Sequence, residues 1–238
     1  MPHTAEILAS SIIVVGNFNP AIFSPDWLER NGLIGNEDAE VAREGAEGRQ
    51  MIVSKQVATF ETGWFSLQVL DNRLELTNKG ALSPAFKDLV VGILQLVPHT
   101  PVVAVGLNFL AHFKLNSEDA YHLVGDALAP KTIWDTLYPG CMVGLAELTI
   151  VIQQGVRGKP PETNDAKRVT VKPSTKIKHG IHMSYNDHHD VQTADDQTRP
   201  VERVVEIIDD QWESSWQDAV RAFDTVLSMT LNKAGKHG

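Results

Sequence analysis

The sequence predicts an α+β fold in which a mostly antiparallel sheet packs against helices. Three observations predict it. Segments rich in β-branched residues follow one another across short turns, which favours antiparallel pairing. Each run of three such segments is followed by a helix with apolar residues at i, i+3 and i+4 spacing. The same order, β-α-β-β-β-α, occurs in both halves of the chain.

The first half opens with a β-branched strand over 11–18. Ser24-Pro25-Asp26 then predicts a helix start, because Ser caps free N–H groups, Pro fits the first turn and Asp favours the positive end of the helix dipole. Residues 36–50 indicate an acidic loop or a frayed helix. We expect three further strands near 51–60, 64–70 and 73–78, and a helix from Ser83-Pro84 to Pro98.

The second half follows the same plan. Ser117-Glu118-Asp119 opens a helical region that ends at Pro139-Gly140, and Ser214 or Ser215 is expected to cap the final helix. A long polar loop is expected over 155–166. Strands are expected over 101–109, 145–154, 167–173 and 176–187.

Local identity between the halves indicates an internal duplication. At an offset of 90 residues, Val15, Gly16, Ala21 and Phe23 match Val105, Gly106, Ala111 and Phe113. The element order of each half resembles the repeat of the TATA-box-binding-protein fold, and the resemblance covers element order only. We therefore expect one domain over 1–238, built from two pseudo-symmetric repeats (approximately 8–98 and 101–231), with a flexible tail over 232–238.

Composition narrows the class of protein. The 238 residues carry a net charge of −9, which argues against coating nucleic acid or an anionic membrane through bulk charge. The single Cys141 excludes an intramolecular disulfide framework and fits a reducing compartment. The apolar run Ile12–Val15 is too short to span a membrane. We expect a soluble cytoplasmic protein with no membrane partner.

Residues 168–188 alternate between apolar odd and polar even positions, so that one face of the strands is polar. Charge is segregated as well, with +4 over 131–178 and −8 over 187–224. The even face is either the solvated side of the sheet or a site for a partner. The candidate partner-binding residues are Arg168, Lys172, Lys176, Lys178, His182 and Asn186.

Chemical motifs give little support to an enzyme. His182 and His188 lie about 20 Å apart on an extended strand, too far to share a zinc ion. No G-x-S-x-G elbow frames a serine, and Cys141 is expected to pack in or near the core. We therefore assign no catalytic residue, no metal ligand and no cofactor.

The leading hypothesis is a soluble, non-enzymatic binding module that uses the exposed polar sheet face, as a subunit, inhibitor or adaptor of a macromolecular assembly. Its expected partner is another protein. One alternative is nucleic-acid binding through the basic strand face 168–178. A second alternative is a hydrolytic or metal-dependent enzyme that uses the His/Asp cluster over 182–190.

Overall fold

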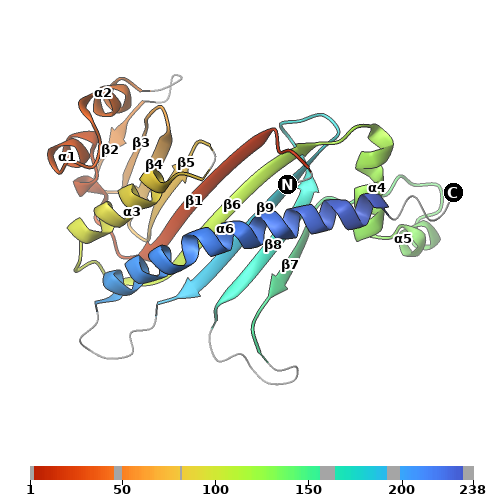
Figure 1. Ribbon diagram of the computed structural model, residues 1–238. Coiled ribbons are helices and arrows are strands. Elements are labelled where there is room, and N and C mark those ends of the chain that lie inside the picture. The colour runs from red at the N-terminus through yellow and green to blue at the C-terminus, as the bar shows by residue number, and fades with distance from the viewer. Residues whose placement is uncertain (1–2, 46–49, 81, 156–163, 192–198, 233–238) are drawn as a thin grey trace.

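A single antiparallel sheet dominates the computed structural model of the chain, which describes residues 3–45, 50–80, 82–155, 164–191 and 199–232. Its strand order is β2-β3-β4-β5-β1-β6-β9-β8-β7, so that β1 and β6 pair at the centre (Figure 1). The strands span β1 Ile7–Gly16, β2 Ile52–Val53, β3 Val57–Glu61, β4 Phe65–Leu70, β5 Arg73–Asn78, β6 Val102–Lys114, β7 Leu148–Ile152, β8 Ala166–Pro173 and β9 Gly180–Asp190.

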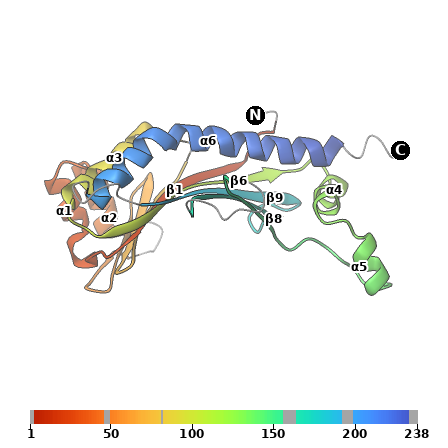
Figure 2. The same ribbon diagram turned by 90° about the horizontal axis from the view of Figure 1, so that it is seen from below.

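The longest helix, α6, runs for 33 residues across the sheet, and Figure 2 shows α3 on the same side of the sheet as α6. At 1.5 Å per residue, a helix of this length reaches about 50 Å. The helices span η1 Pro20–Ile22 (a 3-10 helix), α1 Pro25–Arg30, α2 Asn36–Glu44, α3 Pro84–Leu96, α4 Glu118–Leu128, α5 Thr132–Leu137 and α6 Pro200–Asn232. The expected α+β fold with a large antiparallel sheet is confirmed.

Aromatic side chains join α6 to the central strands. Phe109 of β6 has its ring centroid 5.0 Å from that of Trp212 and 5.5 Å from that of Trp216. Phe86 of α3 also packs against Trp212, with their ring centroids 5.8 Å apart. Phe109 and Trp212 are buried, so this cluster excludes water between the sheet and its two covering helices.

The first half agrees with the expected element order, with two differences. The expected strand 51–60 is broken into β2 and β3, because Ser54 Oγ accepts hydrogen bonds from the N–H groups of Gln56 and Val57 and so forms a turn. The acidic segment after Gly35 forms α2, whose Ala39 and Ala42 are buried. These two alanines are three residues apart and therefore lie on one face of the helix, where their small side chains allow close packing.

The expected start of the last helix is wrong. Ser214 and Ser215 lie in the middle of α6, which begins at Pro200. Serine is a poor indicator of a helix start when its hydroxyl has another partner. Here Ser215 Oγ donates to Asp187 Oδ2 of β9 at 2.5 Å, and Ser214 Oγ donates to the carbonyl oxygen of Gln211 at 3.1 Å.

The expected strand 176–187 begins too early. Residues 174–179 form the turn between β8 and β9, where Ser174 Oγ accepts hydrogen bonds from the N–H groups of Lys176 and Ile177. The expected loop 155–166 lies mostly outside the described residues, and so does the expected tail 232–238. Among the described residues, no helix is long and apolar enough to cross a membrane.

Candidate functional site

The side of the sheet away from α6 carries the candidate site, and we call it the open face. On β9, Met183, Tyr185 and Asp187 are buried toward α6, where Asp187 contacts Ser215. The alternate residues Ser184 and Asn186 therefore point to the opposite side. This matches the predicted alternation, and Figure 2 shows α3 and α6 on the other side of the sheet from this face.

Strand register places polar residues in one line across the open face. Each member is the direct cross-strand partner of the next, from β3 at one end to β8 at the other. Cross-strand partners on one face lie about 5 Å apart, so their side chains interact. We call this line the polar row: Glu61, Ser66, Thr77, Ser11, Asn108, Asn186 and Arg168.

Hydrogen bonds fix the middle of the polar row. Asn186 Nδ2 donates to Asn108 Oδ1 at 2.8 Å, and Arg168 Nη1 donates to Asn186 Oδ1 at 3.2 Å. A Cβ at Gly106 would lie 3.0 Å from Asn186 Nδ2, so glycine leaves the space in which the two amides meet. The three side chains are held in one arrangement that is accessible from the open face.

The six predicted binding residues do not form one basic strand face. Arg168 and Asn186 lie in the polar row, whereas Lys176 and Lys178 lie in the turn after β8 and are exposed. Lys172 is on β8, where its Nζ is 3.1 Å from Glu147 Oε2. The expected continuous basic face over 168–178 is therefore interrupted, because the strand ends at Pro173.

His182 is buried beside a second histidine. It is the cross-strand partner of His112, and the two ring centroids are 4.7 Å apart. His112 Nδ1 lies 2.7 Å from Ser174 Oγ, whereas His182 Nε2 has no hydrogen-bond partner in the described structure. Burial, together with the neighbouring His112 and Lys172, lowers the pKa of His182 to about 4. The pair is therefore neutral near pH 7 and contributes stacking rather than charge.

A second polar cluster lies under α6. The buried Asp187 accepts the hydrogen bond from Ser215, and its Oδ1 is 3.3 Å from His189 Nε2. Burial acts to raise the pKa of Asp187, but His189, Ser215 and Lys167 outweigh it, so the pKa is lowered. In a nucleophilic triad the histidine contacts the serine, whereas here the carboxylate lies between them. This arrangement stabilises the β9–α6 contact and does not activate the serine.

The His/Asp cluster over 182–190 is divided by the sheet. His182 and His188 lie on the open face, and Asp187 and His189 lie on the α6 side. Within the described ranges, no group of three or more His, Cys, Asp or Glu side chains could hold a metal ion. The metal-dependent alternative therefore gains no support from the positions of these residues.

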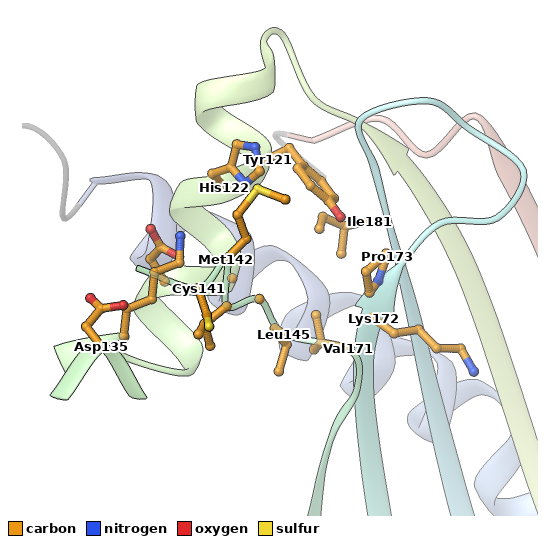
Figure 3. A pocket seen from close by; sticks show the side chains of 15 residues that line it. Tyr121, His122, Asp135, Cys141, Met142, Leu145, Val171, Lys172, Pro173 and Ile181 are labelled. Carbon is orange, nitrogen blue, oxygen red and sulfur yellow. The ribbon is translucent and has the colours of Figure 1, made fainter. Parts of the chain in front are cut away.

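A cavity of about 320 Å³ lies at the other end of the second half, between α4, residues 141–145 and the start of β9. Figure 3 shows His122, Met142 and Cys141 on one side of it, with Tyr121 extending from α4 toward Ile181. Cys141 is exposed, which corrects the expected core packing: residues 141–145 line the cavity and precede the strand β7 rather than joining it. The lining combines apolar side chains with the charged Asp126, Lys131, Asp135 and Lys172, and we assign it no reaction.

The sequence missed five members of the polar row. Four of them lie in the first half and the fifth lies on β6, where polar residues alternate with apolar ones in the same way as in 168–188. That alternation is the sequence pattern from which these residues could have been predicted. Which strands are neighbours, and in which register, depends on tertiary pairing and is invisible in one sequence. Those members are Glu61, Ser66, Thr77, Ser11 and Asn108.

Comparison with known proteins does not assign the chain to a family. No protein-family model matches the chain, and no curated protein has a matching sequence.

Proposed function

We propose that the protein is a non-enzymatic binding module that holds another protein on the open face of its sheet. The observation that carries the proposal is that α3 and α6 share one side of the sheet, while the polar row crosses the other side. Hydroxyl, amide and charged groups along a sheet face bind polar partners through hydrogen bonds, and a fixed arrangement reduces the entropy cost of binding.

The charges of the polar row favour a protein partner over nucleic acid. Glu61 and Arg168 carry opposite charge at its two ends, with Glu61 Oε2 2.9 Å from Lys79 Nζ, and the groups between them are neutral. The two strand cations of the basic segment already have partners, since Arg168 bonds Asn186 and Lys172 pairs with Glu147. A phosphate-binding surface needs cations that are free to replace counterions. Nucleic-acid binding thus has weaker support than protein binding.

We also propose that the two halves are pseudo-symmetric copies of one plan. What supports this is the sheet order, in which β1 pairs with β5 and β6 pairs with β9 on either side of the central β1–β6 pair. The residues identical at an offset of 90 include Val15 and Val105, which lie on those two central strands. In this account, duplication produced one wide open face from two half-sized sheets.

The test is quantitative affinity capture with tagged full-length chain in extract from the native source. Arg168→Glu and Asn186→Lys reverse or add charge within the polar row, and Arg203→Glu makes the same charge change at an exposed position of α6. We expect the wild-type chain and the Arg203→Glu variant each to capture one protein in a near-equal molar amount. Either variant in the polar row should reduce the captured amount about tenfold or more.

Two results contradict the proposal. One is a bound protein that is unaffected by both row variants. The other is a bound species that nuclease removes and that Lys172→Glu, Lys176→Glu and Lys178→Glu together abolish, since this would establish the nucleic-acid alternative.

A further inference from the structure

The strand β7 ends the sheet on one side, with β8 as its only neighbour among the described strands. Its sequence, Leu148 to Ile152, contains no charged residue and no proline. Ile150, Val151 and Ile152 are each about half exposed, at 50%, 55% and 49%. Proteins usually protect an edge strand with a charge, a proline, a bulge or a covering element, because its free N–H and C=O groups pair readily with another strand.

The opposite edge of the sheet is different. The strand β2 has only two residues, Ile52 and Val53, and its register against β3 covers two pairs. A short edge strand gives a second chain few hydrogen bonds. Of the two edges, β7 is therefore the one that offers a regular ladder of apolar residues.

We propose that β7 pairs with β7 of a second copy of this chain, as an antiparallel two-fold contact centred on Ile150. This register places Ile150 opposite itself, Leu148 opposite Ile152, and Thr149 opposite Val151. Beyond the strand, Glu147 falls opposite the neutral Gln153, so that no like charges meet. A two-fold contact needs such self-complementarity, because the same patch faces itself. The proposal goes beyond the binding function and does not depend on it.

The segment that precedes β7 in the chain carries further exposed apolar side chains. Side chains of α5 and of the residues that follow it are exposed, including Ile133, Leu137 and Tyr138, and Met142 is fully exposed. Together with the three exposed β7 residues and Trp134, they present on the order of 1,000 Å² of surface, and a standard interface buries about 800 Å² on each partner. The exposed apolar surface of β7 and of the segment before it is therefore comparable in size to one side of a standard interface.

The first test is the mass of the full chain in solution, followed through a concentration series. We expect twice the chain mass of 26.2 kDa for the wild type. Ile150→Lys brings two positive charges together on the two-fold axis and should raise the dimer Kd on the order of a hundredfold. Ile52→Lys on β2 is the matched control, because Ile52 is 49% exposed, and it should leave the dimer unchanged.

The second test locates the contact. In a Cys141→Ser background, Ile150→Cys should form a disulfide-linked dimer on oxidation, since antiparallel partners have Cα atoms about 4.5–5.5 Å apart, within disulfide range. Ile52→Cys in the same background should stay uncrosslinked. A wild-type chain that remains monomeric at every concentration overturns the proposal. So does a dimer that survives Ile150→Lys and gives no Ile150→Cys crosslink.

Discussion

Ser215 Oγ donates a hydrogen bond to Asp187 Oδ2 at 2.5 Å and thereby joins the middle of α6 to β9. Asp187 is 2% exposed and Ser215 is 1% exposed, so water does not replace this bond. A buried carboxylate that loses a donor keeps the cost of its desolvation. The position of α6 over the sheet, which leaves the opposite face open, depends in part on this pair.

Ser215→Ala should lower the free energy of unfolding by about 1–3 kcal/mol, because Asp187 then lacks one of its hydrogen bonds. Urea unfolding followed by circular dichroism measures the change. Ser214→Ala is the neighbouring control, since Ser214 is exposed and bonds only within α6. Equal effects of the two substitutions would show that the Asp187 contact does not stabilise the fold.

Stability should fall as the pH is lowered from about 6.5 toward 4, because of His182. Its pKa in the folded state is lowered to about 4 from 6.5, so the unfolded chain binds a proton in this window and the folded chain does not. The loss should reach about 3 kcal/mol at most. Asp187 acts in a different window, since its pKa is lowered from 3.8 and its contribution is lost only at still lower pH.

His182→Phe keeps the stacking on His112 and removes one of the two imidazoles, the other being His112, whose pKa burial and Lys176 also lower. We expect its free energy of unfolding to depend less on pH between 6.5 and 4 than that of the wild type. His122→Phe, at an exposed position of α4, should retain the wild-type dependence. A His182→Phe curve that runs parallel to the wild-type curve would mean that another group titrates in this window.

Position 16 should accept no residue larger than glycine. A Cβ there would lie 2.5 Å from the carbonyl oxygen of Pro101, which belongs to the backbone and cannot move aside easily. Gly16→Ala should therefore cost about 1–3 kcal/mol of stability. Gly63→Ala, where nothing lies within 4 Å of the new Cβ, should change stability by about 0.5 kcal/mol or less. Thermal or urea unfolding of the two variants distinguishes close packing at Gly16 from a general effect of replacing glycine.

The fold class could be predicted from the sequence because the residue patterns that indicate it are local. Alternation over 168–173 and the apolar spacing from Phe86 to Leu94 follow directly from strand and helix geometry. The start of α6 was missed because the cap-like Ser215 has a tertiary partner, Asp187, which sequence does not reveal. Local propensity is a weak prior where a long-range contact decides the structure.

Only part of the candidate site could be predicted from the sequence, for the same reason. Arg168 and Asn186 were identified because they alternate with apolar residues on β8 and β9. Asn108 was not, since its role depends on the pairing of β6 with β9 in one register. Lys176 and Lys178 were placed on a strand that ends before them, at the turn formed by Ser174.

The most direct test of the open-face account is site-specific photo-crosslinking in native extract. A photoreactive residue in place of Ser184 lies on β9 beside the polar row, and one in place of Gln217 lies on the exposed side of α6. The account predicts a crosslink to one partner protein from position 184 and none from position 217. A partner that crosslinks from position 217 and not from position 184 would contradict it.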